Sequence, residues 1–210
     1  MTARCSFLAR LGAAAAVLGL GSASALAERP GEWQPARDAK DDWFDQILGK
    51  HRLFFDALTA QGTTAAMGFA DNYFTASKSG YGLDARDLAV VICLRHMSTP
   101  FAFTDAFWAK YGAPMGESIT FTDPKTSQPP VVNVYKARLE ALVRLGVHFA
   151  VCDLASHRFA GVIARKVDGN ADGIYKEMTG NVIGNAHFVA AGIIAVNRAQ
   201  ERGYSVSYAG

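Results

Sequence analysis

Short apolar stretches alternate along the chain with segments in which apolar residues recur at helical spacing. This pattern predicts strands separated by helices. Short stretches rich in β-branched and aromatic residues are typical of strands, and they lie at 51–58, 88–94, 147–152, 186–192 and 204–209. The stretch LAVVICL, residues 88–94, has no polar residue, which indicates a strand buried on both faces of a parallel sheet. The alternation predicts a three-layer α/β/α domain.

Apolar residues three and four positions apart predict helices in the segments between these strands. The helices are expected at 62–79, 101–112, 134–146, 156–167, 171–183 and 193–203. In the first, Ala66, Phe69, Tyr73 and Ala76 form the expected buried stripe. Glycines are expected to close the helices: Gly80 and Gly82 the first, and Gly112, Gly146 and Gly203 three of the others. Residues 113–133 contain several prolines and no helical period, so we expect a long loop there.

The first 27 residues have the composition of a secretory signal peptide. Arg4 and Arg10 precede and border an apolar stretch from Leu11 to Leu20, and the segment ends in Ala-Leu-Ala with no acidic residue. We expect cleavage after Ala27, a periplasmic or secreted protein, and no membrane span after cleavage. Residues 28–50 are interpreted as an N-terminal extension laid over a domain of residues 51–210, into which the 113–133 loop is inserted.

Charge and cysteine content narrow the classes of partner. Without the signal peptide, 19 basic residues face 19 acidic ones, and no basic stripe with interleaved aromatics suggests nucleic acid. The sequence has no phosphate-binding glycine loop and no nucleophile elbow, and we expect no cofactor. Cys93 and Cys152 are too few for a disulfide scaffold; a bridge between them is the minority alternative, because both lie in predicted strands.

Candidate chemistry lies where predicted strands run into helices. Ligands of open parallel sheets bind beyond the carboxyl ends of the strands, and here these are the turns RHMSTP, CDLASHR and AAGII. Cys152 ends one strand, and the following helix would favour its thiolate. His96 is a candidate acid, base or anion donor, and Ser98 and Thr99 are candidate ligand-binding residues, with Thr99 also expected to cap the helix that follows.

Each of these residues also has a structural interpretation. A free cysteine in a strand is often a small buried apolar residue, and Asp153 would oppose thiolate formation if its carboxylate faced the sulfur. His96 could simply hydrogen-bond a loop carbonyl. A metal site built from Cys152, His96, His157 and His187 would need convergence in space, and no metal-binding spacing supports it, so no metal site is predicted.

Three stretches resemble the DsrE/DsrF-like sulfur-relay superfamily, and in particular its exported branch. They are VVICLRHMSTPFAFTDAFW (90–108), LVRLGVHFAVCDLASHR (142–158) and AAGIIAVNRAQERGY (190–204). The resemblance covers about three quarters of the chain. It implies a mostly parallel five-stranded α/β/α domain that forms homo-oligomers and carries sulfane sulfur as a persulfide on a cleft cysteine. Cys152 matches that cysteine, and His96 falls at the expected cleft.

Two functional hypotheses follow from the sequence. In the first, the protein is an exported DsrE-like sulfur carrier or sulfurtransferase that takes a small sulfur-containing ligand on Cys152. In the second, it is a non-enzymatic oligomeric module that binds a small ligand or a metal, and Cys152 is a buried structural residue. The chain departs from the cytoplasmic sulfur-relay members in its signal peptide, its 113–133 loop and the absence of a second cysteine soon after Cys152.

Overall fold

A computed structural model describes residues 37–210 of the chain. The expected signal peptide and the first part of the 28–50 extension lie outside the described residues. Within the described part, no helix is both long enough and apolar enough to cross a membrane.

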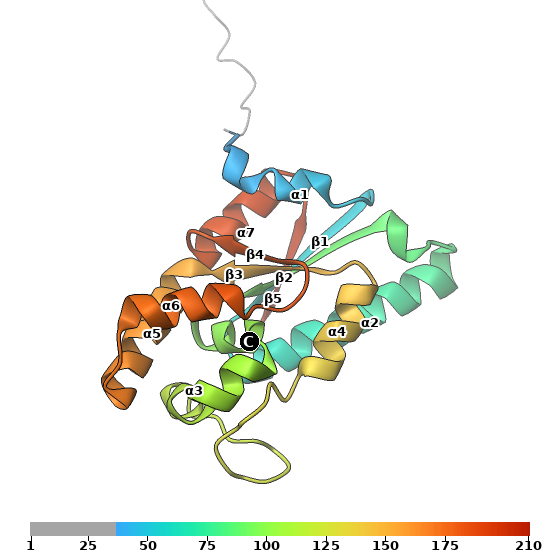
Figure 1. Ribbon diagram of the computed structural model, residues 1–210. Helices are drawn as coiled ribbons and strands as arrows, with labels where there is room; N and C mark the ends of the chain where they lie inside the picture. Colours follow the sequence, from blue (N-terminus) through green and yellow to red (C-terminus); the bar gives the residue numbers. More distant parts are fainter. Residues whose placement is uncertain (1–36) are drawn as a thin grey trace, which may run out of the picture. The chain divides into compact units, whose positions relative to one another are not determined.

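The five predicted strands form one sheet in which every pairing is parallel (Figure 1). They are β1 (His51–Ala57), β2 (Leu88–Leu94), β3 (His148–Cys152), β4 (Ala186–Val189) and β5 (Ser205–Ala209), in the order β4-β3-β2-β1-β5. This confirms the three-layer α/β/α class. All seven residues of β2 are buried, as its apolar run predicts, because β2 is the central strand and both of its faces are covered.

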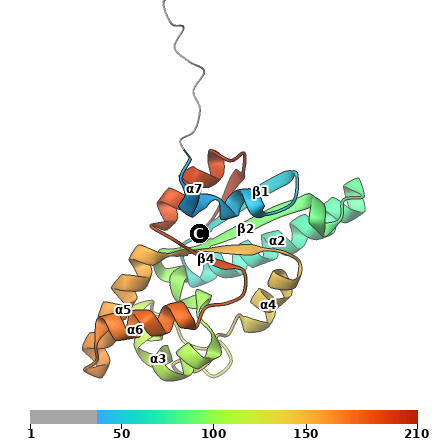
Figure 2. The same cartoon turned by 45° about the horizontal axis from the view of Figure 1, so that its top comes forward.

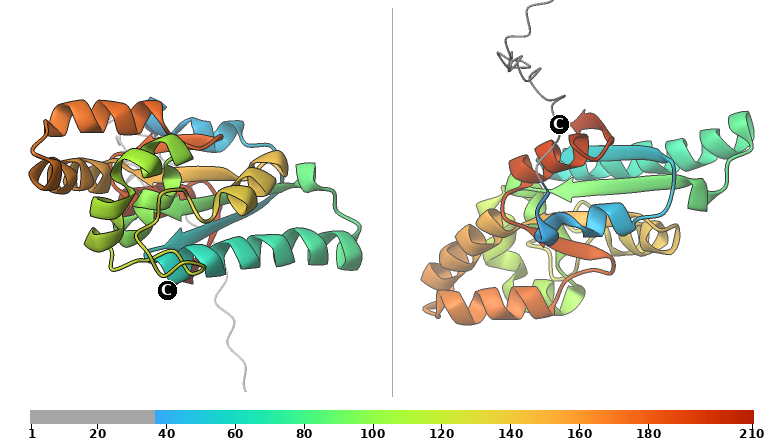
Figure 3. Two further views of the ribbon diagram at one scale, coloured as in Figure 1. Left: turned by 60° about the horizontal axis from the view of Figure 1, so that its bottom comes forward. Right: turned by 90° about the horizontal axis from the view of Figure 1, so that it is seen from above.

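Helices α2 (Ala60–Tyr81) and α4 (Lys136–Arg144) cover one face of the sheet (Figure 3). The stripe predicted for α2 is rotated in the structure: Ala66 is buried, but Phe69 is 47% exposed and Ala76 is exposed. The buried side consists of Thr63, Ala66, Met67, Ala70 and Ser77. Most of these residues are small, and small residues let a helix lie close to a sheet. A search for large apolar residues in the sequence does not find such a helix face.

The opposite face is covered by α7 (Gly192–Gln200) and by the short α1 (Trp43–Gln46), which belongs to the N-terminal extension (Figure 2). Trp43, Phe44 and Ile47 pack with strand residues in this core. Trp43 stacks on His187 of β4, with ring centroids 4.1 Å apart. The described part of the extension therefore completes a hydrophobic layer.

The helix expected at 101–112 begins and ends later than the pattern predicts. Residues His96–Ala102 form a 3-10 helix, η3, and α3 spans Asp105–Ser118 with Thr104 at its N-cap. Thr99 is therefore not the cap of α3. Gly112 is also not a helix stop: a Cβ there would lie 1.8 Å from the carbonyl oxygen of Pro130, so its missing side chain makes room for the returning loop.

The loop after α3 is shorter than the predicted 113–133 segment. Helix α3 continues through Pro114 because its apolar side, from Phe107 and Trp108 to Met115, stays buried and outweighs the hydrogen bond that proline removes. Buried Asn133 anchors the end of the loop, donating to the carbonyl oxygens of Phe101 and Phe103 at 2.8 Å each.

Helices α5 (Asp153–Val167) and α6 (Ala171–Gly180) pack together and against α3, forming a third apolar core beyond the strands. Helix α5 begins at Asp153, three residues before the predicted start, so no loop separates it from β3. This places Cys152 both at the last position of a strand and at the N-cap of a helix.

Candidate functional site

The three strand-to-helix turns selected from the sequence line one cavity of about 240 Å³. Its wall consists of Arg95, His96, Cys152, Leu154, Ala155, Arg158, Ala191, Gly192 and Ile193. These residues follow β2, β3 and β4, which lie side by side, so their carboxyl ends meet at one edge of the sheet (Figure 1). We call this space the Cys152 cavity.

Cys152 lies in the wall of this cavity with 6% of its surface exposed. It is the N-cap of α5, and Ala191 is the N-cap of α7; neither helix has a side-chain cap. At α5 the Leu154 N–H donates to the Ala190 carbonyl oxygen at 3.3 Å, so a backbone group occupies part of this helix end. Helix N-termini carry partial positive charge. A thiolate or a small anion in the Cys152 cavity would therefore lie near two favourable helix ends.

The Asp153 carboxylate is engaged by other groups. The Tyr175 hydroxyl donates to it at 2.5 Å, and the His157 ring lies 3.7 Å from its other oxygen. Burial, together with this carboxylate, raises the pKa of Tyr175 to about 12, which keeps the phenol protonated and donating. His157 stacks on Tyr175 at 3.7 Å between ring centroids. The Asp153 carboxylate thus has partners of its own on α5 and α6.

Arg95 is the most firmly held charged residue of the cavity. Its guanidinium donates two hydrogen bonds to buried Asp56 of β1, at 2.6 and 2.8 Å, and this carboxylate raises the pKa of Arg95. Gly192 packs directly on the other side: a Cβ at this glycine would lie 2.4 Å from Cβ of Arg95. The ion pair and the glycine together fix the arginine in the wall.

His96 is exposed and lies in the same wall as Cys152. Its φ of 56° is in the left-handed region, which a histidine adopts at a cost that the surrounding structure must offset. Backbone strain of this kind occurs often at functional sites. The left-handed backbone at His96 thus lies in the wall of the Cys152 cavity.

Ser98 and Thr99 do not line the Cys152 cavity. Both are fully buried, and their hydroxyls donate to backbone carbonyls: Ser98 to Ala57 and Arg95 at 2.7 Å each, and Thr99 to Leu94 at 3.3 Å. These bonds hold the turn after β2 in shape. The structure therefore places the two residues behind the turn, where they support it.

Cys93 lies on the neighbouring strand and is fully buried. Burial raises the pKa of its thiol well above the ordinary value, and its sulfur lies 3.9 Å from the carbonyl oxygen of Gly192. Both cysteines are free in the structure. In the sheet, Cys93 pairs with Ala150, which lies two residues before Cys152 on β3. The backbones of the two cysteines are therefore offset along the strands.

Two cationic residues of the cavity were not singled out from the sequence. Arg95 is the first residue after β2, so its position at the end of a strand could have identified it as a site residue from the sequence. Arg158 lies in the second turn of α5, and its guanidinium is 4.9 Å from the ring of Phe159. It is exposed and forms no ion pair with any residue in 37–210, so its charge is available to a ligand.

The histidines considered as metal ligands are dispersed. His187 is bonded to His148, with Nε2 and Nδ1 2.9 Å apart, beneath Trp43. His157 lies beside Asp153, and only His96 shares a cavity with Cys152. Across residues 37–210, no group of three or more histidine, cysteine or acidic side chains is placed to hold a metal.

The reversal of strand order lies between β1 and β5, at some distance along the sheet from the Cys152 cavity. The chain itself fills this point. The Thr59 hydroxyl donates to the Gly210 carbonyl at 2.7 Å, and a Cβ at Gly62 would lie 2.1 Å from the carbonyl oxygens of Ala209 and Gly210. Within residues 37–210, the backbone at 209–210 therefore occupies the position beside this reversal.

Comparison with protein-family models and with curated proteins gave no match. Among solved structures, the chain is similar to a protein of unknown function, MTH1491, from Methanobacterium thermoautotrophicum. The two share 12% identity with a TM-score of 0.44, and the alignment covers 76% of this chain and 99% of the other.

Proposed function

We propose that the protein is an exported, DsrE-like sulfur carrier that holds sulfane sulfur on Cys152. The observation that carries the proposal is the position of this thiol, in the wall of a cavity that joins two helix N-termini without side-chain caps and two arginines. A thiolate is the reactive form of cysteine, and cationic surroundings favour it. The resemblance of residues 142–158 to the sulfur-bearing segment of the superfamily supports the same residue.

The proposed chemistry is a transfer of one sulfur atom without net oxidation. The Cys152 thiolate attacks a sulfane sulfur of a polysulfide or thiosulfate, the donor's S–S bond breaks, and the shortened polysulfide or sulfite leaves with the electron pair. Cys152 then carries a persulfide. An acceptor thiolate attacks the outer sulfur, and the Cys152 thiolate leaves.

The residues around Cys152 have distinct proposed roles. Arg158, which has no ion-pair partner among the described residues, attracts the anionic donor. Arg95 is a fixed hydrogen-bond donor in the wall, because Asp56 and Gly192 hold it, and the Asp56 carboxylate offsets much of its charge. His96 stabilises the anion that leaves or forms. Homo-oligomerisation is part of the proposal, and light scattering on the purified protein tests it directly.

The experiment is mass spectrometry of intact protein after treatment with polysulfide or thiosulfate. We expect wild type and Cys93→Ala to gain the mass of one sulfur atom, which a reductant removes, and Cys152→Ser to gain none. His96→Asn is a suitable partner variant because asparagine also tolerates the left-handed backbone, and it is expected to load more slowly. Equal loading of wild type and Cys152→Ser, or no loading of either, would overturn the proposal.

The low exposure of Cys152 favours the second function, a non-enzymatic ligand-binding module in which this thiol only packs. Alkylation of the native protein separates the two. A sulfur carrier is expected to label at Cys152 while folded, with Cys93 protected by its burial. Labelling of Cys152 only in denaturant would support the packing role.

A further inference from the structure

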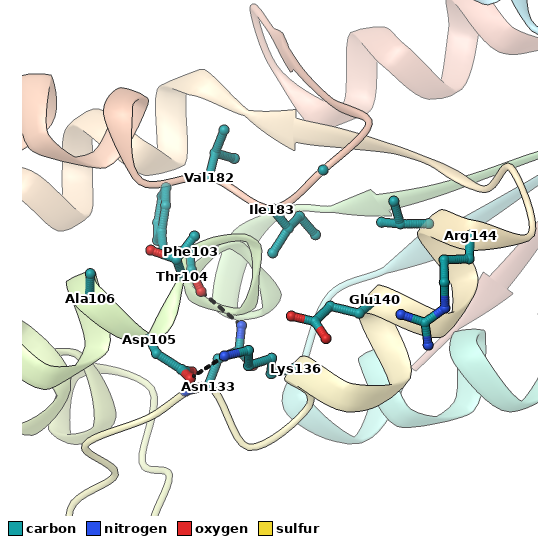
Figure 4. A pocket seen from close by; sticks show the side chains of 12 residues that line it. Phe103, Thr104, Asp105, Ala106, Asn133, Lys136, Glu140, Arg144, Val182 and Ile183 are labelled. Carbon is teal, nitrogen blue, oxygen red and sulfur yellow. Dashed lines mark hydrogen bonds and ion pairs between the residues drawn. The ribbon is translucent and has the colours of Figure 1, made fainter.

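A second cavity, of about 480 Å³, lies away from Cys152. It is bordered by the start of α3, by α4 and by the segment 181–185 that leads into β4 (Figure 4). We call it the α4 cavity. None of its lining residues lines the Cys152 cavity.

The walls of the α4 cavity are held by backbone hydrogen bonds. Phe103 and Val182 form an antiparallel bridge, the Thr104 N–H donates to the Asn181 carbonyl at 2.8 Å, and the Ile183 N–H donates to Ala102 at 2.9 Å. The cavity is therefore present before any ligand binds. Its volume falls within the range of roughly 300–1,000 Å³ that is usual for small-molecule sites.

The interior of the α4 cavity is mainly apolar. Phe103, Val143, Val182 and Ile183 line the cavity from three separate segments, and Figure 4 shows Phe103, Val182 and Ile183 on one side of it. Apolar walls with a few polar groups at one side are typical of sites for small organic molecules. An apolar group of the ligand would lie against these four residues.

The polar side of the cavity leaves one group of each charge unpaired. Asp105 and Lys136 form an ion pair at 2.9 Å, and the amide of Asn133 is occupied by backbone groups. Glu140 and Arg144 also line the cavity, one helical turn apart on α4, yet neither forms an ion pair with any residue in 37–210. Both are exposed, so their charges face solvent. Asp105 and, more weakly, Glu140 raise the pKa of Lys136, so Glu140 also attracts this lysine without forming an ion pair with it.

We infer that the α4 cavity binds a small zwitterion with an apolar side chain, the chemistry of a large apolar amino acid. The ligand's ammonium group would pair with Glu140 and its carboxylate with Arg144, while its side chain fills the apolar interior. A ligand with only a negative charge would face Glu140, and one with only a positive charge would face Arg144. This inference is independent of the sulfur chemistry proposed for Cys152.

The experiment uses a matched set of probes with isothermal titration calorimetry of the full chain. Phenylalanine carries both charges, N-acetylphenylalanine lacks the ammonium, phenylethylamine lacks the carboxylate, and glycine lacks the apolar group. We expect saturable binding of phenylalanine and at least about tenfold weaker binding of the other three, since each loses one charge-assisted contact or the apolar burial.

Variants locate the binding. Glu140→Gln and Arg144→Gln are each expected to weaken phenylalanine about tenfold, while Arg165→Gln, an exposed arginine outside the cavity, leaves it unchanged. Ala106→Trp places bulk in the cavity and should abolish binding. Ala109→Trp, on the same helix but outside the cavity, should not.

Two results would overturn the inference. One is the absence of saturable phenylalanine binding to a wild-type protein whose circular dichroism shows it folded. The other is binding that is equal for phenylalanine and N-acetylphenylalanine, or equal for Ala106→Trp and Ala109→Trp. Circular dichroism of every variant separates loss of binding from loss of fold.

Discussion

The Cys152 cavity and the α4 cavity differ in how their charged residues are held. In the first, Arg95 is bonded twice to buried Asp56 and pressed by Gly192, so the charge is part of the fold. In the second, the Asp105–Lys136 ion pair lies at the surface. Glu140 and Arg144 of this cavity, like Arg158 of the first, are exposed and have no ion pair within the described residues. A charge that the fold fixes can preorganise a site for chemistry, whereas a free charge is suited to reversible binding.

The largest expected difference between the cavities is in the free energy of unfolding. Arg95→Met leaves the buried carboxylate of Asp56 without its partner and is expected to cost about 3 kcal/mol. Arg144→Met removes an exposed charge and should change stability by no more than about 0.5 kcal/mol. Urea unfolding of both variants measures this.

A second substitution tests whether the Asp56 charge causes that loss. Replacing Asp56 by leucine in the Arg95→Met protein removes the unpaired charge, and it should restore part of the stability. If Arg95→Met and Arg144→Met lowered the free energy of unfolding by equally small amounts, the conclusion that the fold holds Arg95 but not Arg144 would be wrong.

Glycine-to-alanine substitutions in the two cavities are expected to give a smaller difference in the free energy of unfolding. A Cβ at Gly192 would lie 2.4 to 2.9 Å from three carbons of Arg95, so Gly192→Ala must displace that side chain, at about 1–3 kcal/mol. The three atoms nearest to a Cβ at Gly184 in the α4 cavity belong to the side chain of Val143, at 3.1 to 4.0 Å. Gly184→Ala is therefore expected to cost less than about 1 kcal/mol.

Thermal and urea unfolding measure both glycine variants, and the alkylation rate of Cys152 reports any change in its cavity. That rate should change in Gly192→Ala and stay constant in Gly184→Ala. The opposite order of effects would show that the contact between Gly192 and Arg95 is unimportant.

The smallest predicted effect is the pH dependence of stability that arises from His148 on β3 and His187 on β4, two of the strands that end at the Cys152 cavity. Burial and the adjacent His148 lower the pKa of His187 to about 4, and burial lowers that of His148. In the unfolded chain a histidine titrates near pH 6.5, so between about pH 6.5 and 4 the unfolded chain binds more protons. This contribution to stability is complete above about pH 6.5 and is lost as the pH falls through that window.

We expect a loss of about 1 kcal/mol from this pair, reduced by solvent because both rings are only half-buried. Unfolding at a series of pH values measures it in wild type and in His187→Gln, which keeps a polar partner for His148. The difference between the two proteins isolates the histidines from carboxylates that titrate in the same range. Parallel pH curves for the two proteins would rule the pair out as the cause.

The fold was largely predictable from local patterns, and the failures have particular causes. Glycines were expected to close helices, and Gly82, Gly146 and Gly203 each have a positive φ beyond the end of one. Gly80, also expected to close a helix, lies inside α2. Gly112 was also interpreted as a stop, but it is a contact point for Pro130. A glycine that closes a helix and a glycine that admits a distant backbone have the same appearance in a sequence.

The candidate site was predictable in its location but not in its electrostatics. The rule for carboxyl ends of parallel strands selected the turns that contain His96 and Cys152, and these turns line one cavity. The same rule could not show that Asp153 is bonded to Tyr175, 22 residues later, or that Arg95 is held by Asp56, 39 residues earlier. Such pairs depend on packing between elements, which local periodicity does not contain.

The sequence by itself determined the strands, most of the helices, and the edge of the sheet where Cys152 lies, because these follow from side-chain periodicity and from the geometry of parallel strands. Only the tertiary structure decided which charges near Cys152 are fixed and which are free. It alone assembled the α4 cavity, whose residues come from α3, α4 and the approach to β4. A cavity formed by segments distant in sequence exists only once those segments have packed together.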